Sequence, residues 1–175
     1  MNYDLSPVLH TTEHYANVKL FMQKAQQRTP SGPGEPSAET RVLRARLIYE
    51  EAMETINALG VVISVDAAST GPEVRTVELN SPQECEVTSP KFAVTEVFNL
   101  QEIADGCADI KVVTTGTLIA CGLPDHAIQQ LVDQNNLAKF GPGHRIDEGG
   151  KLIKPPNHQP PDIAGLLFAI EKQTG

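Results

Sequence analysis

Six acidic residues, gathered in two short stretches of the chain, are the strongest candidates for chemistry. The first stretch carries Glu50, Glu51 and Glu54, and the second carries Glu102, Asp105 and Asp109. Carboxylate oxygens are the ligands that hard divalent cations such as Mg²⁺ and Mn²⁺ prefer, and these ions often leave positions for water and substrate phosphate. Facing each other on two helices, the stretches would form a divalent metal site that a phosphorylated ligand completes.

Helical spacing places two of the first acids on a stripe that should be apolar. Leu43, Leu47, Glu51, Glu54 and Ala58 follow steps of four, four, three and four, so they share one face. Burying a lone carboxylate costs several kcal/mol unless it is paired, protonated or bound to metal. Taken alone, this helix also fits a solvated face with an ordinary acid cluster. The second stretch, whose acids also follow steps of three and four, favours the metal interpretation.

Other metals are disfavoured by the residues that accompany the acids. No histidine stands in the Glu-x-x-His arrangement of ferritin-like di-iron centres. The three cysteines, Cys85, Cys107 and Cys121, include no Cys-x-x-Cys pair, and no set of His and Cys has zinc-ligand spacing. An odd set of cysteines without such a pair fits a reducing cytoplasm.

A group of cations near the C-terminus contrasts with the net charge of −8. It consists of Lys139, Arg145, Lys151 and Lys154. Metal on one side and cationic side chains on the other are the features of a pocket that binds polyphosphate. In such a pocket the metals neutralise phosphate oxygens and activate water for in-line attack, and the cationic side chains hold the leaving pyrophosphate. The alternative is a basic loop that balances an acidic surface. The chain has no Gly-x-x-x-x-Gly-Lys-Ser/Thr motif, which excludes a P-loop enzyme.

Composition excludes two further classes of partner. The acidic net charge and a pI near 5.1 argue against a nucleic-acid surface, because binding the phosphate backbone requires clustered Lys and Arg. No apolar run approaches the ~20 residues of a membrane span. The N-terminus lacks the basic region and apolar core of a signal peptide. We therefore expect a cytoplasmic protein that binds neither nucleic acid nor membrane.

Hydrophobic periodicity predicts that the elements carrying these residues are helices. The expected helices run from Thr11 or Thr12 to Gln27, from Ala38 to Leu59, from Leu100 to Ala120, from Pro124 toward Lys139, and from Ile163 to Lys172. The expected N-caps are Ser37, Asn99 and Asp162, and the expected helix-ending glycines are Gly60 and Gly122. The apolar face of the first helix comprises Tyr15, Val18, Phe21, Met22 and Ala25, and that of the last comprises Leu166, Leu167 and Ile170.

Residues 61–97 interrupt the helical pattern. Segments 61–65, 74–79 and 91–97 are rich in β-branched residues and are separated by Gly-Pro or Ser-Pro pairs. They predict a β-hairpin or a three-stranded insertion, with a disordered loop as the alternative. The expected fold is therefore all-α: one four-helix-bundle domain over residues 1–175, with a β-rich insertion at 61–97 between the second and third helices and an extended C-terminal tail at 140–175.

At these residues the sequence resembles the all-α nucleoside triphosphate pyrophosphohydrolases of the MazG and phosphoribosyl-ATP pyrophosphohydrolase type. The resemblance covers roughly residues 15–60 and 98–165, outside the insertion. The motifs that carry it are Glu50-Glu51-Ala-Met-Glu54, Ile103-Ala-Asp-Gly-Cys-Ala-Asp109 with the preceding Glu102, Asn135-Asn136-Leu-Ala-Lys139, and Gly149-Gly150-Lys151-Leu-Ile-Lys154. The interval of 47 residues between Glu54 and Glu102 is longer than is usual in such sequences.

The resemblance implies roles for individual residues. Glu51, Glu54, Glu102 and Asp105 would be ligands of two or more Mg²⁺ or Mn²⁺ ions per site. The catalytic acids would be Glu50, Glu51 and Glu54, with Glu50 as a further ligand or as the base that orients the attacking water. Substrate would be held by Asn136, Lys139, Arg145, Lys151 and Lys154, across a subunit boundary of a homodimer or homotetramer.

The reaction implied is the conversion of a (deoxy)nucleoside triphosphate to its monophosphate and pyrophosphate. Short stand-alone members with this kind of tail include phage-borne MazZ-like enzymes that act on guanine nucleotides, which makes dGTP or GTP the expected substrate. Two alternatives remain open: phosphoribosyl-ATP hydrolysis, and a non-catalytic, metal-stabilised helical scaffold that binds nucleotide.

Overall fold

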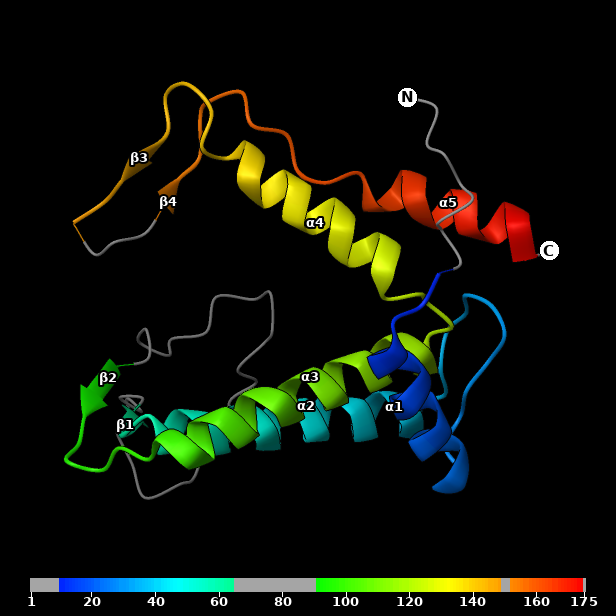
Figure 1. Cartoon of the computed structure of the whole chain (residues 1–175), viewed down its shortest axis with the longest axis horizontal. Helices are drawn as coiled ribbons and strands as arrows, with labels where there is room; N and C mark the ends of the chain where they lie inside the picture. Colours follow the sequence, from blue (N-terminus) through cyan, green and yellow to red (C-terminus); the bar gives the residue numbers. More distant parts are fainter. Residues whose placement is uncertain (1–9, 65–90, 149–151, 175) are drawn as a thin grey trace, which may run out of the picture. The chain divides into compact units, whose positions relative to one another are not determined.

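The structure, a computed structural model, describes residues 10–64, 91–148 and 152–174. Within these ranges the chain is mostly helical (Figure 1). The helices are α1 (Glu13–Lys24), α2 (Ala38–Ala58), α3 (Leu100–Ala120), α4 (His126–Ala138) and α5 (Ile163–Thr174). The strands are β1 (Val61–Ser64), β2 (Lys91–Val94), β3 (Arg145–Ile146) and β4 (Leu152–Ile153). No helix of the described ranges is both long and apolar enough to span a bilayer.

Two compact units make up the chain. The first comprises residues 1–46 and 112–175, and the second comprises residues 47–111. Helices α2 and α3 each contribute to both, and both predicted acid stretches belong to the second unit. The bundle arrangement and the single domain over residues 1–175 stay predictions.

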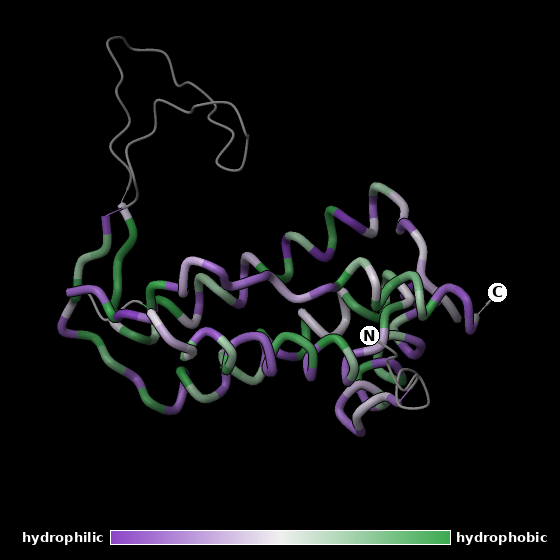
Figure 2. Tube along the Cα trace, turned by 90° about the horizontal axis from the view of Figure 1, so that it is seen from above, coloured by the Kyte–Doolittle hydropathy of each residue, from purple (hydrophilic) through white to green (hydrophobic). Residues whose placement is uncertain are grey.

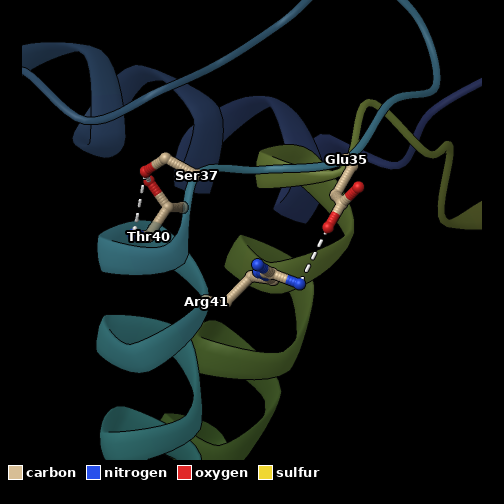
Figure 3. Close-up of polar contacts among 4 residues, drawn as sticks. All are labelled: Glu35, Ser37, Thr40 and Arg41. Carbon is tan, nitrogen blue, oxygen red and sulfur yellow. Dashed lines mark hydrogen bonds and ion pairs between the residues drawn. The ribbon is translucent and has the colours of Figure 1, made fainter.

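Helices α1, α2, α3 and α5 begin where short polar side chains satisfy their free N–H groups. At the start of α2, the Ser37 hydroxyl accepts the backbone N–H of Thr40 at 3.2 Å, and Arg41 forms an ion pair of 2.8 Å with Glu35 (Figure 3). Asp162 accepts the N–H of Gly165 at 2.9 Å in front of α5. These caps confirm the predicted starts of α2 and α5.

Several helix boundaries differ from the prediction. Helix α2 ends at Ala58, one residue early, and α5 ends at Thr174, two residues late. Helix α1 ends at Lys24, not Gln27, because Gln26 adopts a left-handed backbone with φ of 57° and the N–H of Gln27 returns to the carbonyl of Met22 at 2.8 Å. Helix α4 begins at His126, so placing Pro124 in its first turn was wrong. The carboxylate of the intervening Asp125 makes no capping bond in α4 and instead accepts the N–H of Thr12 at 3.2 Å, as well as its hydroxyl.

Apolar and polar residues are interspersed along the helices (Figure 2). Buried apolar residues form two clusters in the first unit. One joins Tyr15, Val18 and Met22 of α1 to Ile119 and Ala120 of α3. Phe21 and Ala25, predicted on the same face of α1, are exposed. The other cluster consists of Leu166, Leu167 and Ile170 of α5, which confirm the predicted face, against Ala127, Ile128 and Leu131 of α4.

Two short strands lie at the ends of the predicted β-rich insertion. Strands β1 and β2 pair antiparallel, with Val61 opposite Val94 and Ser64 opposite Lys91. At the base of this pair, the N–H of Thr95 donates to the carbonyl of Gly60 at 2.6 Å. The predicted strand 74–79 lies outside the described residues. The predicted third segment is shorter than expected, since β2 ends at Val94 and not at Val97.

Candidate metal centre

Helices α2 and α3 approach closely in the second unit at Thr55 and Gly106. A Cβ atom on Gly106 would lie 2.3 Å from Oγ1 and 3.2 Å from Cβ of Thr55. The Thr55 hydroxyl donates to the carbonyl of Glu51 at 2.7 Å, which fixes the threonine rotamer. Only glycine fits at position 106 without moving one helix. The close contact therefore brings the backbone segments that carry the two acid stretches against each other.

Glu51 is the acid at the centre of the cluster. Its side chain is partly buried, and this burial raises its pKa above the ordinary value of 4.5. Repulsion by Asp109, Glu54, Glu50 and Asp105 raises the pKa of Glu51 further. The structure thus brings together carboxylates of both stretches, and it includes Asp109, which belongs to the acidic face but not to the predicted ligand set.

The face of α2 that is buried differs from the predicted face by a rotation about the helix axis. Thr55 and Ala58 are buried and Glu51 is half-buried, whereas Leu43 and Glu54 are exposed. The reason is the contact with Gly106, which places Thr55 rather than Glu54 against α3. Of the two acids expected on a core stripe, Glu51 lies there and Glu54 lies at its exposed edge.

A pocket of about 260 Å³ lies beside the acid cluster in the second unit. Glu54 of α2 and Glu102 of α3 both line it, so the structure brings these two predicted ligands to one cavity. The remaining lining residues are Asn57, Ala58, Val97 and Asn99. Sequence reasoning missed Asn57 and Val97 and treated Asn99 only as a cap. The available signal was spacing, because Asn57 follows Glu54 by three positions and Asn99 precedes Glu102 by three.

The donor chemistry of the cluster fits a hard divalent cation. Four carboxylates repel the carboxylate of Glu51, and a cation with oxygen ligands would relieve that repulsion. Within the ranges that the structure describes, no three Asp, Glu, His or Cys side chains converge closely enough to hold a metal ion as they stand. Binding would therefore require rotation of long, partly exposed glutamate side chains, which have several staggered rotamers available. The metal site stays a prediction.

The predicted substrate-binding residues lie in the first unit. Lys139 Nζ donates to Asn136 Oδ1 at 2.5 Å near the end of α4. Arg145 lies on β3, opposite Ile153 of β4, and Lys154 directly follows β4. The antiparallel β3–β4 pair was not predicted from the sequence. Lys151 falls outside the described residues, and the role of these cations toward a substrate stays a prediction.

The polar groups around the end of α4 hold the tail in place. His158 Nε2 lies 3.1 Å from Asn135 Oδ1, and Asn135 Nδ2 donates to the carbonyl of Gln159 at 2.8 Å. His144 Nδ1 lies 3.0 Å from the carbonyl of Gly141. Within the described residues these two histidines serve the local structure of the tail.

The raised pKa of Glu51 leads to a testable dependence of stability on pH. A carboxyl whose pKa is higher in the folded than in the unfolded state favours folding while it is protonated, and this contribution is lost as pH rises through the folded pKa. In metal-free buffer with EDTA, Glu51→Gln should therefore raise the melting temperature relative to wild type above pH 4.5, where the unfolded group is ionised. The difference should vanish toward lower pH. A lower melting temperature of the variant at pH 7 would contradict this assignment.

A family model described as phosphoribosyl-ATP pyrophosphohydrolase matches residues 17–136, which is more than half of the chain. The matched range includes both acid stretches, the Thr55–Gly106 contact and the pocket, and it ends before β3. The comparison with curated proteins found no match.

Proposed function

The chain belongs to the phosphoribosyl-ATP pyrophosphohydrolase family, and from that premise we propose that it is a Mg²⁺- or Mn²⁺-dependent enzyme converting a (deoxy)nucleoside triphosphate to its monophosphate and pyrophosphate. The family supports hydrolysis of a phosphoanhydride bond in a nucleotide. The single observation that supports the metal-dependent reaction best is the crowding of four carboxylates from α2 and α3 around Glu51. Such a concentration of negative charge attracts cations and repels a triphosphate that has no bound metal ion.

In the proposed mechanism the acids have divided roles. Glu51, Glu54, Glu102 and Asp105 hold the cations, of which we expect two or more. The chemistry that bound cations supply is neutralisation of phosphate oxygens as negative charge builds up in the transition state. Glu50, exposed beside this group, orients the attacking water and accepts its proton. The pocket lined by Glu54 and Glu102 admits part of the substrate next to these acids.

We propose that the tail cations hold the pyrophosphate. Lys139 and Asn136 are already joined by a hydrogen bond, Arg145 lies on β3, and Lys154 directly follows β4. Phosphate oxygens accept charge-assisted bonds from such groups, which stabilise the leaving group. Lys151, between the strands in sequence, is assigned the same role. These contacts would cross a subunit boundary in a homodimer or homotetramer, a state that light scattering during gel filtration tests directly.

Lys154→Ala tests this phosphate-binding role. Loss of one charge-assisted bond should raise KM for the nucleotide by about 10-fold. The rise in melting temperature caused by Mn²⁺ alone should stay at its wild-type value, since the lysine binds phosphate and not metal. Lys111→Ala provides a matched loss of charge on α3, outside the tail. Equal losses of nucleotide and metal binding in Lys154→Ala would contradict the assignment.

A guanine nucleotide, dGTP or GTP, is our proposed substrate, resting on the likeness of the tail to MazZ-like enzymes. Phosphoribosyl-ATP is the second candidate, which the description of the matched family favours. The test is a panel of the four dNTPs, the four NTPs and phosphoribosyl-ATP, with pyrophosphate release measured in the presence and absence of Mn²⁺. Turnover of phosphoribosyl-ATP above all triphosphates would select the second candidate. If no substrate is turned over, the proposal that the protein is an enzyme fails, and the nucleotide-binding scaffold is the alternative that is left.

A further inference from the structure

Asn99 connects the end of α2 to the start of α3 beside the pocket. Its backbone N–H donates to the carbonyl of Ala58, the last residue of α2, at 3.0 Å. Its side-chain Oδ1 accepts the N–H groups of Gln101 and Glu102, the second and third residues of α3, at 3.1 and 3.2 Å. One residue therefore holds both helix ends, through its backbone on one side and its side chain on the other.

These bonds lie next to the two acids that share the pocket. Ala58 is one helical turn beyond Glu54, and Glu102 itself donates its N–H to Asn99. Ala58 and Asn99 also line the cavity that Glu54 and Glu102 line. A short path of hydrogen bonds through Asn99 therefore connects the helix ends that carry the two acids.

The segment leading to Asn99 is held in place independently. The N–H of Thr95 donates to the carbonyl of Gly60 at 2.6 Å. Gly60 has φ of 71°, and a Cβ atom there would lie 1.7 Å from the carbonyl oxygen of Val97, so the two backbones are in direct contact. Asn99 thus reaches α3 from a fixed position at the end of α2, and its cap defines where the first turn of α3 begins.

We propose that Asn99 is a positioning residue for the acid cluster, which sets the separation of Glu54 and Glu102 for divalent cation binding. This inference rests on the proposed function. Both acceptor directions of Oδ1 are occupied by backbone N–H groups, so this oxygen is not a ligand and Asn99 acts through Glu102. Outer residues that orient metal ligands typically contribute about 10- to 100-fold to metal affinity or activity.

The test compares Asn99→Ala with Ser37→Ala. Both substitutions remove a side-chain N-cap, but Ser37 caps α2 at its far end, in the first unit (Figure 3). Asn99→Ala should reduce kcat by about 10- to 100-fold. The MnCl₂ concentration that gives a particular rise in melting temperature should increase by a similar factor. Ser37→Ala should leave both values within about 2-fold of wild type, although it loses a comparable cap.

Asn99→Ser separates positioning from direct contact with substrate. Serine keeps an oxygen acceptor for the first turn of α3 and lacks the amide nitrogen. Recovery of kcat and of the Mn²⁺ response to within about 3-fold of wild type is expected. If the serine variant recovers the Mn²⁺ response but not kcat, the amide nitrogen contacts substrate and the positioning role is overturned. It is also overturned if Asn99→Ala and Ser37→Ala have equal effects.

The Mn²⁺ response keeps this inference separate from the proposed function. If wild type releases no pyrophosphate from any nucleotide, the proposed reaction fails, while the shift of melting temperature with MnCl₂ still compares the three variants. If wild type binds no Mn²⁺ by this measure, the positioning role fails, whatever the panel of nucleotides shows.

Discussion

Glu54→Gln and Asp105→Asn should each lower pyrophosphate release by at least about 100-fold and abolish the stabilisation by Mn²⁺. Each substitution keeps the shape of the side chain and removes a negative charge from the group that surrounds Glu51. Losing one fixed electrostatic group from such a site typically costs about 100- to 1,000-fold in rate. The measurements are steady-state pyrophosphate release with saturating Mn²⁺ and melting temperature with and without MnCl₂.

The matched control for these variants is Glu39→Gln. Glu39 is an exposed carboxylate in the first turn of α2, and the groups that lower its pKa, led by a hydrogen bond from its own backbone and one from Ser37, belong to that turn. This variant should keep the wild-type rate and metal response. Near wild-type turnover in both Glu54→Gln and Asp105→Asn would show that the acid cluster is not the active site.

Gly106→Ala should destabilise the protein by about 1–3 kcal/mol, the usual cost of an added methyl group in a tight contact. Alanine gains about 1 kcal/mol over glycine in helix propensity, so the sign depends on whether Thr55 can move. The added Cβ would meet Oγ1 of Thr55 at 2.3 Å, and also its Cβ at 3.2 Å and its Cα at 3.3 Å. Because rotation of the hydroxyl leaves the last two contacts, α2 and α3 would have to separate, and turnover should fall with stability.

Two further variants make this prediction specific. Gly34→Ala introduces the same methyl group where its nearest neighbour, Nη2 of Arg28, would lie at 3.8 Å, and stability should not fall. Combining Gly106→Ala with Thr55→Ala removes the shortest of the three contacts, so the double variant should recover part of the lost stability. Urea denaturation measures all four proteins, wild type included. A Gly106→Ala variant as stable as wild type would disprove the tight helix contact.

Local sequence signals predicted the helices well because each boundary depends on a few neighbouring residues. Asn99 and Gly122 mark the start and end of α3 by a side-chain cap and a left-handed backbone with φ of 70°, and both are visible as residue types. The early end of α1, at Lys24 and not at Gln27, also depends on one neighbouring residue. Gln26 takes the left-handed conformation that the sequence pattern would assign to glycine or asparagine.

Local sequence signals could not predict which residues of α2 and α3 contact each other. The predicted stripe passed through Leu43 and Glu54, whereas Arg44 and Thr55 are the buried positions. Each of the two lies against a glycine of α3: a Cβ on Gly116 would be 2.7 Å from Nη1 of Arg44 in the first unit, and Gly106 faces Thr55 in the second. Which face of a helix is buried depends on such contacts with a distant segment. Hydrophobic periodicity within one segment carries no information about them.

The acids of the candidate site were predictable as residue types, and their pocket was not. Glu54 and Glu102 stand out in the sequence because charged side chains in a helical pattern require an explanation. Val97 lines the same cavity and carries no such signal, because its place there depends on the close approach of its backbone to Gly60. The β3–β4 pair was also missed, because strands of two residues each are too short for an alternating pattern.

The pairing of Ser64 with Lys91 brings together the two ends of the sequence that makes the interval between the acid motifs long. The chain leaves the ladder and returns to it at two opposed residues, so a loop of any length can join the two strands without changing their pairing. For the same reason, a two-residue Asn-Gly turn could replace residues 65–90 in an engineered minimal enzyme, because such turns join paired antiparallel strands directly.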